Sequence, residues 1–443
     1  MTAELQPSDA ADFADAMAAF APFEPAPRLA LAVSGGVDSM ALALLARDWL
    51  RSRDGEGIAL IVDHGLRPGS GAEAVLVAQR CRDLGLRPEI LTWQGQRPVS
   101  AIEEAARQAR YRLLEQACAS HGCLHLLTAH HAGDQQETIA LRQARASGPL
   151  GLAGMAACTE RAGLRLLRPL LAWPKARLRA IASAAGASWI DDPMNADRRF
   201  ARARLRADGL ADPPPSSVRM RQGLERRLVG ALPGLVALDR FGVARMSRAA
   251  WRMLAADLQE PALARIALAV GGGCYGPGSA PLVRLARGLD AAGPLSATLG
   301  GCLWRAGHAH VTVSREVRNL PPPMPLDEGA GLLWDGRFLV QGAAGEGLAV
   351  LPVAALTAGE MHPLRPLRRA LGLPAAATAG LPAIRDLEGL LAVPHLGYAR
   401  SGRTAPFSAV FRPRHALSPV PFAAIGDRVD GDAQGRGALH LAC

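Results

Sequence analysis

Short apolar runs alternate with longer amphipathic segments between residues 28 and 190. The apolar runs predict buried strands at residues 29–33, 58–62, 89–92, 124–128 and 164–167. The segments between them predict helices at residues 40–52, 71–84, 101–120 and 135–145. Because parallel strands require long crossover connections, this alternation predicts an α/β fold built on a doubly wound parallel sheet.

The pattern changes after residue 212, where a run of prolines at 213–215 can continue neither a helix nor a central strand. Further on, residues 297–303 and 308–314 predict paired strands, and Asp335-Gly336 predicts a two-residue hairpin turn. We expect four parts: an N-terminal extension (1–27), an α/β catalytic domain (28–212), a helical domain (218–290) and a mixed, β-containing C-terminal region (291–443).

The chain of 443 residues has a formal charge of +10 and an isoelectric point near 10.0. Such a charge suits a polyanionic partner such as nucleic acid, although a solvated basic surface is the alternative. The seven cysteines are scattered and none forms a C-x-x-C pair, which argues against a disulfide scaffold and favours a reducing compartment. No apolar run reaches the roughly 18 residues of a membrane span, and the acidic start is unlike a signal peptide. We therefore expect a cytoplasmic protein without a membrane partner.

A glycine-rich loop lies between the first predicted strand and the first predicted helix, with the sequence Ser34-Gly35-Gly36-Val37-Asp38-Ser39. In this setting backbone N–H groups and a helix N-terminus bind phosphate, and glycines let the backbone approach the anion. An aspartate is unusual beside phosphate unless it holds a cation such as Mg²⁺. The loop lacks the Gly-Lys-Ser/Thr of a P-loop NTPase. The combination favours a nucleotide, with an ordinary glycine turn capped by serine as the alternative.

Two further polar motifs follow the second and fourth predicted strands, at the sheet edge where doubly wound folds bind ligands. They read Asp63-His64-Gly65-Leu66-Arg67 and His130-His131-Ala132-Gly133-Asp134-Gln135-Gln136-Glu137-Thr138. The second motif is a candidate for catalysis, although Asp134 and Glu137 would stabilise a helix N-terminus without any catalytic role. A zinc site that includes both histidines is disfavoured, because adjacent side chains point apart.

Two groups of arginines are candidates for contacts with a large anionic substrate. Glu103, Arg107 and Arg110 share one face of a predicted helix, where an exposed ion pair is the alternative. Five arginines within nine residues follow the acidic turn at 191–197: Arg198, Arg199, Arg202, Arg204 and Arg206. A solvated helix would explain this run, but its place after a nucleotide-binding sheet favours contacts with phosphates.

The glycine-rich loop resembles that of the N-type ATP pyrophosphatases, the PP-loop superfamily, and the order of all motifs is similar to that of the tRNA(Ile)-lysidine synthetase family. Besides the motifs above, the series includes Glu103-x-x-Ala106-Arg107-x-x-Arg110-Tyr111, Gly151-Leu152-x-Gly154-Met155, Arg168-Pro169-Leu170 and Asp192-Pro193-x-Asn195-x-Asp197. The resemblance covers roughly residues 29–206, and the ordered series is more specific than any one motif. Two positions depart from the family pattern: Gly133 stands where an acidic residue is frequent, and Ala203 where an asparagine is common.

The resemblance implies a ligase that uses ATP to adenylate the wobble cytidine of the isoleucine tRNA with a CAU anticodon, and then joins C2 of that base to L-lysine. AMP and pyrophosphate are released. It implies ATP binding by Ser34, Gly35, Gly36, Val37, Asp38 and Ser39, and catalysis by Asp38, His131, Asp134 and Glu137. It also implies Mg²⁺ held by Asp38 and Asp134, and tRNA contacts by Arg107, Arg110, Arg202, Arg206 and the domain 218–290.

Other interpretations stay open. A tRNA thiolase shares the loop and the partner but needs paired cysteines, and an NAD or GMP synthetase would not explain the arginine run. A non-catalytic RNA-binding relative would not explain the presence of Asp38, Asp134 and both loop serines. The oligomeric state is also open, with a homodimer as one alternative.

Overall fold

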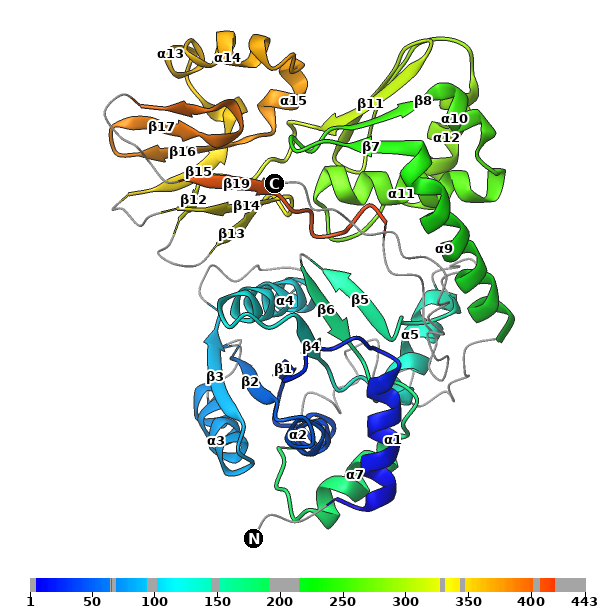
Figure 1. Cartoon of the computed structure of the whole chain (residues 1–443), viewed down its shortest axis with the longest axis vertical. Helices are drawn as coiled ribbons and strands as arrows, with labels where there is room; N and C mark the ends of the chain where they lie inside the picture. The colour runs from blue at the N-terminus through cyan, green and yellow to red at the C-terminus, as the bar shows by residue number, and fades with distance from the viewer. Residues whose placement is uncertain are drawn as a thin grey trace.

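The computed structural model describes residues 5–63, 65, 69–93, 102–144, 152–161, 163–190, 215–326, 331–342, 347–400 and 407–418. Three groups of elements are visible in Figure 1, with an α/β domain at one end of the molecule and two mixed domains side by side at the other. Helix α9 (Pro215–Leu235) runs along one side, from the level of α5 (Ala132–Ala144) to the second domain.

The α/β domain is built on a six-stranded sheet with the strand order β3-β2-β1-β4-β6-β5. Its strands are β1 (Arg28–Ala32), β2 (Glu56–Asp63), β3 (Arg87–Thr92), β4 (His125–Leu127), β5 (Cys158–Arg161) and β6 (Leu164–Leu167). Its helices are α1 (Pro7–Ala18), α2 (Val37–Arg51), α3 (Ser70–Asp83), α4 (Ile102–Ser120), α5 (Ala132–Ala144) and α7 (Lys175–Ala184). Paired strands are parallel except for β5, which is antiparallel to β6. The predicted parallel-sheet α/β domain is confirmed, whereas β5, α1 and α7 are not among the predicted elements.

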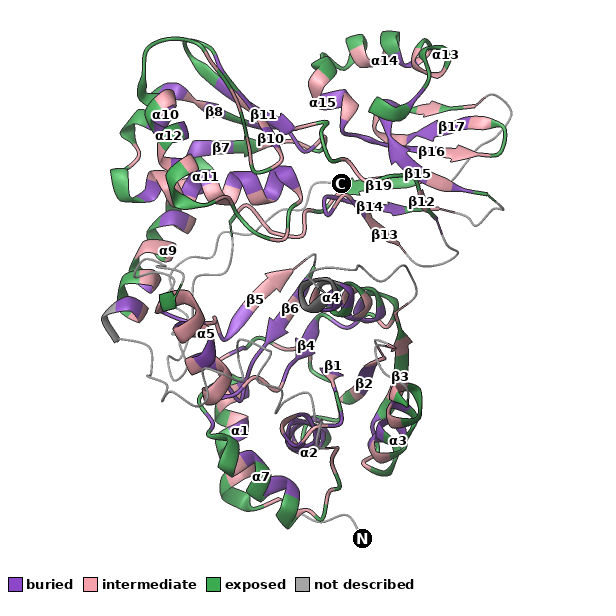
Figure 2. Ribbon diagram, turned by 180° about the vertical axis from the view of Figure 1, so that it is seen from behind, coloured by how far each residue is buried: buried purple, intermediate pink, exposed green. Residues whose placement is uncertain are grey.

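Successive residues of β1 face opposite sides of the sheet. Leu29 and Leu31 are buried in a cluster with side chains of α1, α2, α3 and α7, whereas Ala30 lies in a second cluster under α4. This is the two-residue period of a strand, and coverage of both faces explains why β1 is apolar after Arg28. Figure 2 shows buried residues along α2 and the central strands, with exposed residues on the outer faces of α3 and α7.

Helix α1 packs against the α/β domain. Phe13 and Met17 are buried in the same core as α2 and α7. Arg177 of α7 donates hydrogen bonds to carboxylate oxygens of Asp9 and Asp12, each at 2.6 Å. We therefore propose that the domain includes α1, rather than starting after an extension that ends at residue 27.

The second domain packs helices against a five-stranded antiparallel sheet with the order β7-β8-β11-β10-β9. Its elements are α9 (Pro215–Leu235), β7 (Val236–Leu238), β8 (Ala244–Ser247), α10 (Arg248–Met253), α11 (Ala256–Gly271), α12 (Ser279–Asp290), β9 (Leu295–Leu299), β10 (Cys302–Ala306) and β11 (His310–Arg315). One cluster of buried side chains extends from Leu228 of α9 to Val313 of β11. Because helices and strands share this core, we propose limits of 215–315 for the domain, in place of a helical domain that ends at 290.

The single strand predicted at residues 297–303 is wrong, because the structure divides these residues between β9 and β10. Gly300 and Gly301 have φ values of +64° and +73° and form the turn between the two strands. Two successive residues with positive φ reverse the chain in a tight hairpin, and glycine adopts this conformation without strain. The apolar side chains continue on both sides of the turn, so the hydrophobic pattern alone does not reveal it.

The third domain contains two antiparallel sheets, with the orders β12-β15-β16-β17-β18 and β13-β14-β19. Its elements are β12 (Met324–Pro325), β13 (Leu332–Trp334), β14 (Phe338–Gln341), β15 (Ala349–Pro352), α13 (Ala358–Met361), α14 (Leu364–Ala370), α15 (Ala375–Ala379), β16 (Pro382–Asp386), β17 (Gly389–Val393), β18 (Tyr398–Ala399) and β19 (Ser408–Phe411). The predicted hairpin turn is confirmed: Asp335 and Gly336 join β13 to β14 with φ values of 52° and 64°.

Candidate active site

The carboxyl ends of β1 and β4 meet where the strand order of the sheet reverses. From β1 the chain proceeds outward through β2 and β3, and then returns to β4 on the other side of β1. The two strands pair directly and in parallel, with Leu31 opposite Leu127. The glycine-rich loop that follows β1 and the histidine motif that follows β4 therefore lie side by side. A crevice at such a switch point is the usual ligand site of a doubly wound sheet.

The loop after β1 has the geometry of a phosphate-binding turn. Gly35 has a φ of +84°, and a Cβ atom there would lie 2.4 Å from Val77 Cγ2, so that only glycine fits. Gly36 is the N-cap of α2, whose first turn offers unpaired N–H groups to an anion. The hydroxyl of Ser39 donates to the carbonyl of Gly36 at 2.9 Å, and the hydroxyl of Ser34 donates to Ser39 Oγ at 3.3 Å.

Asp38, His131, Asp134 and Lys175 converge beside this loop. Asp38 Oδ2 lies 3.7 Å from His131 Nε2 and 3.5 Å from Lys175 Nζ. Asp134 Oδ2 lies 3.8 Å from the same His131 nitrogen and accepts a hydrogen bond from the His131 backbone N–H at 3.0 Å. Both carboxylates are about a quarter exposed, whereas the imidazole is buried. The structure thus brings together three of the four predicted catalytic residues at the carboxyl edge of the sheet.

Gly133 determines how the His131 ring is oriented. Its backbone N–H donates to His131 Nδ1 at 3.0 Å, which assigns the ring proton to Nε2, facing the two carboxylates. A Cβ atom at position 133 would lie 2.8 Å from His131 Cε1. The departure from the family pattern at Gly133 therefore has a structural consequence, since a larger residue would require the imidazole to move.

The two carboxylates fit a Mg²⁺ ion. Asp38 Oδ1 is buried and makes no hydrogen bond within the described ranges, while Oδ2 of Asp38 and Oδ2 of Asp134 approach one imidazole nitrogen. In the part of the chain that the structure describes, no three His, Cys, Asp or Glu residues form a closed metal cage. Mg²⁺ does not require one, because one or two carboxylates together with water and substrate phosphates complete its coordination. The donor set therefore suits a Mg²⁺ ion that is shared with a nucleotide.

Lys175 is a site residue that the sequence analysis does not identify. It is the first residue of α7, and its side chain is about half exposed. It is also the only lysine among the 50 lysines and arginines of the chain. A planar guanidinium cannot replace a compact ammonium group at every site. The presence of a single lysine in an arginine-rich chain could therefore have pointed to Lys175 as a site residue.

Gln135, which follows Asp134, connects α5 to the motif at residues 151–155. Gln135 is buried, and its side-chain amide donates to the Met155 carbonyl at 3.1 Å and accepts from the Met155 N–H at 2.6 Å. Gly154 has a φ of +75°, and a Cβ atom there would lie 2.6 Å from Gln135 Oε1. The Gly-x-Met part of the motif at 151–155 is thereby attached to α5. Glu137, the fourth predicted catalytic residue, is buried on this helix.

The other predicted residues fall into two groups, those that the structure describes and those outside the described ranges. Arg107 and Arg161 both stack on the ring of Tyr111, with guanidinium carbons 5.2 and 4.4 Å from its centroid. Arg110 is exposed on α4. Asp63, at the end of β2, accepts a hydrogen bond from the Gly65 N–H at 2.8 Å. Several predicted positions lie outside the described residues: His64, Leu66, Arg67, Asp192, Arg202, Ala203 and Arg206.

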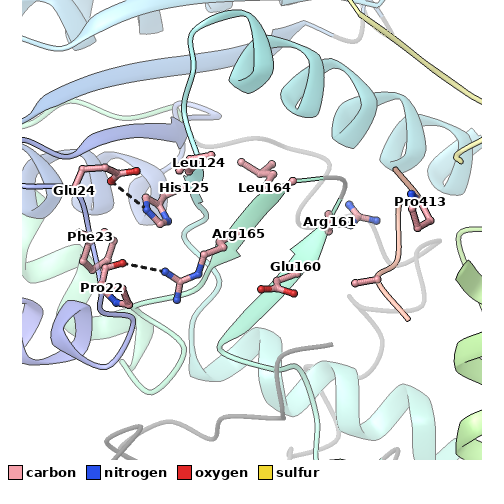
Figure 3. A pocket seen from close by; sticks show the side chains of 12 residues that line it. Pro22, Phe23, Glu24, Leu124, His125, Glu160, Arg161, Leu164, Arg165 and Pro413 are labelled. Atoms are coloured by element: carbon pink, nitrogen blue, oxygen red, sulfur yellow. Dashed lines mark hydrogen bonds and ion pairs between the residues drawn. The ribbon is translucent and has the colours of Figure 1, made fainter. Parts of the chain in front are cut away.

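A cavity of about 620 Å³ lies at the opposite edge of the sheet, where β4 and β6 begin. Figure 3 shows its lining, with Glu24 Oε2 3.3 Å from His125 Nε2, and with the Arg165 guanidinium donating to the carbonyl of Pro22 at 3.4 Å. Because parallel strands begin at this edge, the cavity is separate from the Asp38–His131–Asp134 cluster.

The described cysteines form no disulfide. Burial raises the pKa of the Cys118 thiol, and it raises the pKa of Cys123 to about 11. Thiols with a raised pKa carry little thiolate near neutral pH and are therefore poor nucleophiles.

None of the helices in the described ranges combines the length and apolar composition needed to cross a bilayer.

Comparison with known proteins shows which families this chain is similar to. A family model described as a PP-loop domain matches residues 9–210. The tRNA(Ile)-lysidine synthase of Bradyrhizobium sp. (strain BTAi1) is 51% identical over 196 residues, which cover 44% of this chain and 55% of that protein. The tRNA(Ile)-lysidine synthase of Ruegeria pomeroyi is 35% identical over 402 residues, which cover 86% and 91%. A solved structure, the U34-tRNA thiolase NcsA from Methanococcus maripaludis, has 13% identity and a TM-score of 0.38, covering 50% of this chain and 73% of its own.

The fold and the site define a PP-loop domain, the class of ATP-binding domain in which a glycine-rich turn after the first strand faces the switch point of the sheet. Two relatives are matched over more than two thirds of their own length, so the similarity extends beyond this domain. The chain belongs to the tRNA(Ile)-lysidine synthase family. Its matches to three relatives that are 46% to 51% identical span little more than half of their length, from 53% to 58%.

Proposed function

We propose that this protein ligates L-lysine to C2 of the wobble cytidine in the isoleucine tRNA with a CAU anticodon, at the expense of ATP. The observation that carries the proposal is the convergence of Asp38, His131, Asp134 and Lys175 beside the glycine-rich loop of a chain in this family. Two carboxylates, an imidazole and an ammonium at a phosphate-binding turn suit the activation of a substrate by ATP.

In the first step the C2 oxygen of the cytidine attacks the α-phosphorus of ATP. A phosphorus–oxygen bond forms to the base, the bond to the β-phosphate breaks, and pyrophosphate leaves. The N–H groups at the start of α2 and the hydroxyls of Ser34 and Ser39 would bind the departing pyrophosphate. Mg²⁺ held by Asp38 and Asp134 would supply charge neutralisation. Lys175 adds a positive charge beside Asp38.

In the second step the ε-amine of lysine adds to C2, the bond from C2 to the AMP oxygen breaks, and the amine loses a proton. His131 is poorly placed to accept this proton, because its Nδ1 already accepts from Gly133 and its Nε2 proton faces two carboxylates. We assign His131 to orientation of the carboxylates. We assign proton transfer or placement of the lysine amine to Glu137, which lies three residues after Asp134 and hence on the same side of α5.

The described residues on either side of the arginine run 198–206 lie at the phosphate loop and in the second domain. Before it, the backbone N–H of Ile190 donates to the Gly35 carbonyl in the phosphate loop at 2.8 Å. After it, helix α9 begins at Pro215. We propose that this basic segment, which joins the two in sequence, contacts the backbone of a tRNA whose anticodon reaches the loop.

The decisive experiment measures AMP release with each amino acid in turn, in the presence and absence of isoleucine tRNA. We expect AMP only when lysine and this tRNA are both present, together with a lysine-modified nucleoside in the digested tRNA. AMP release that requires a sulfur donor would identify a tRNA thiolase instead. Binding of tRNA without any AMP would identify a non-catalytic relative.

We expect Lys175→Ala to lower kcat/KM for ATP about tenfold or more, which corresponds to about 1.4 kcal/mol of transition-state stabilisation. The reason is the loss of a positive charge 3.5 Å from Asp38. Steady-state kinetics at several ATP concentrations measure it. Arg179→Ala, an exposed charge removed from the same helix, is the matched control and should leave kcat/KM unchanged. Equal effects of the two substitutions would remove Lys175 from the site.

Replacing both Cys118 and Cys123 by alanine should leave lysine-dependent AMP release unchanged. The thiols of Cys118, on α4, and Cys123, shortly after α4, are both buried and far from ionisation at neutral pH, so they should contribute only to packing. Thermal unfolding should show a loss of stability of about 1 kcal/mol. Loss of activity in a variant that keeps its unfolding transition would favour the thiolase alternative.

We expect Arg202→Ala/Arg206→Ala to weaken binding of cognate and non-cognate tRNA alike, because contacts with phosphates do not depend on base identity. The slope of log K against log salt should flatten by about one unit for each lost contact. Binding titrations at several salt concentrations measure it, and affinity for ATP should stay constant. A slope equal to that of the unmodified protein would assign the two arginines to ordinary solvated surface.

A further inference from the structure

The start of helix α7 belongs to the candidate active site but has no side-chain cap of its own. Lys175 is the first residue of the helix, and its Nζ lies 3.5 Å from Asp38 Oδ2. Pro174 precedes it as the N-cap and offers no side-chain hydrogen bond to the first turn. The helix is only 10 residues long, and isolated helices of this length are marginal in water. Contacts with other elements must therefore determine where Lys175 lies.

Arg177 connects the first turn of α7 to α1. Its Nε and Nη2 donate to Asp9 Oδ1 at 2.8 and 2.6 Å, and its Nη2 also donates to Asp12 Oδ2 at 2.6 Å. The two helices lie side by side in both Figure 1 and Figure 2. Helix α1 is itself held in the core of the domain through Phe13 and Met17. Because hydrogen bonds between a guanidinium and carboxylates are strong and directional, they tie α7 to a fixed element.

The same guanidinium stacks on Trp173. Its Cζ lies 3.8 Å from the centroid of the indole ring, and this ring is buried in the core of the α/β domain. The Trp173 carbonyl accepts a hydrogen bond at 3.0 Å from the N–H of Ala132, the residue directly after His131. Residues 173–177 therefore contact α1 through one end and the histidine motif through the other.

Arg177 does not face Asp38 itself. It follows Lys175 by two residues, and side chains at this spacing on a helix point in different directions. Lys175 approaches Asp38, whereas Arg177 approaches the carboxylates of α1. An effect of Arg177 on the reaction would therefore act through the position of α7.

We propose that Arg177 is a positioning residue, which holds the ammonium group of Lys175 beside Asp38 by tying α7 to α1. This gives α1, which comes before the first strand of the sheet, a role in the site. The proposal rests on the proposed function only for the assignment of Lys175 to the ATP reaction. The position of Lys175 can be measured without that reaction.

Lys175 is the only lysine of the chain, so protein labelled with carbon-13 lysine should give a single ε-methylene signal in an NMR spectrum. Asp38→Asn shows where this signal lies when the ion pair is lost. Arg177→Ala should move the signal toward that position. The milder variant Asp9→Asn/Asp12→Asn should do the same, because it removes the charges that Arg177 binds.

Two matched controls remove exposed charges from the same helices. Arg179→Ala on α7 and Asp15→Asn on α1 should leave the signal where it is in the unmodified protein. A signal that stays in place in Arg177→Ala would overturn the proposal. So would a signal that is the same in the unmodified protein and in Asp38→Asn, since Lys175 would then not be held at Asp38.

A double-mutant cycle separates positioning from a general loss of stability. Arg177→Ala should lower kcat/KM for ATP about threefold to tenfold, up to the effect of losing Lys175 itself. In a protein that already carries Lys175→Ala, the same replacement should have no further effect, because the group that it positions is absent. Two effects that multiply would contradict positioning, and weaker binding of tRNA by Arg177→Ala would assign Arg177 to the RNA instead. If the unmodified protein shows no AMP release with L-lysine and tRNA, the proposed function fails, while the NMR signal still tests the position of Lys175.

Discussion

Replacing Asp38 by asparagine should nearly abolish AMP formation while tRNA still binds. The substitution preserves the size of the side chain but removes the negative charge that makes Asp38 a ligand for Mg²⁺, and its buried Oδ1 has no other partner in the described ranges. Electrostatic stabilisation by a metal is worth several kcal/mol, so kcat should fall by about 10²–10³-fold. Single-turnover AMP release at saturating Mg²⁺ and ATP measures the effect.

Asp48→Asn provides the matched control for this substitution. Asp48 is also on α2, is about as exposed as Asp38, and is paired with Arg47 rather than with the cluster at the sheet edge. Its replacement should leave kcat unchanged. Turnover by Asp38→Asn equal to that of Asp48→Asn would show that Asp38 does not hold a cation, and would leave the glycine-rich loop without a metal ligand on α2.

Replacing Asp335 by asparagine should destabilise the contact between the second and third domains by about 3–5 kcal/mol. Asp335 accepts hydrogen bonds from Arg315 of β11 at 2.9 and 3.0 Å and from Arg337 at 2.7 Å, and all three side chains are less than a tenth exposed. Burial lowers the pKa of Arg337, and the charge of Asp335 opposes this shift. Loss of the carboxylate leaves two buried guanidinium groups without a counter-charge.

Asparagine is the informative replacement at this position. Asp335 has a φ of 52° in the hairpin turn, a conformation that asparagine tolerates better than most residues, so the effect reports the lost charge rather than backbone strain. Differential scanning calorimetry should show a lower transition temperature. Asp257→Asn removes the partner of Arg227 in an exposed ion pair and should leave the transition where it is. If both variants unfold at the same temperature, the buried cluster contributes no more than a surface pair.

Much of the α/β domain could be predicted because its elements follow from local patterns. The central strands of the parallel sheet are covered on both faces and appear as continuous apolar runs, and each helix between them has one apolar side. The hairpin at Asp335-Gly336 was predictable because a turn with positive φ at both central residues selects Asp and Gly. The strand boundary at Gly300 and Gly301 could not be located from hydrophobicity, since the apolar residues continue across the turn.

Some residues of the candidate site could likewise be predicted from the sequence, and others could not. The glycine-rich loop and the histidine motif were found because their residue types match phosphate binding and catalysis, and each follows a strand directly. Lys175 was missed because it begins a helix more than 130 residues after Asp38 and belongs to no motif.

The class of fold, the phosphate loop and the family resemblance could be established from the sequence, because they depend on the order and local spacing of residues along one stretch of chain. Which side chains share a site became known only from the three-dimensional packing. The adjacency of β1 and β4 places Asp38 beside His131 and Asp134, the contact with Gly133 orients the imidazole, and the start of α7 adds Lys175. Contacts of this kind join residues distant in sequence, and no local periodicity encodes the distance between them.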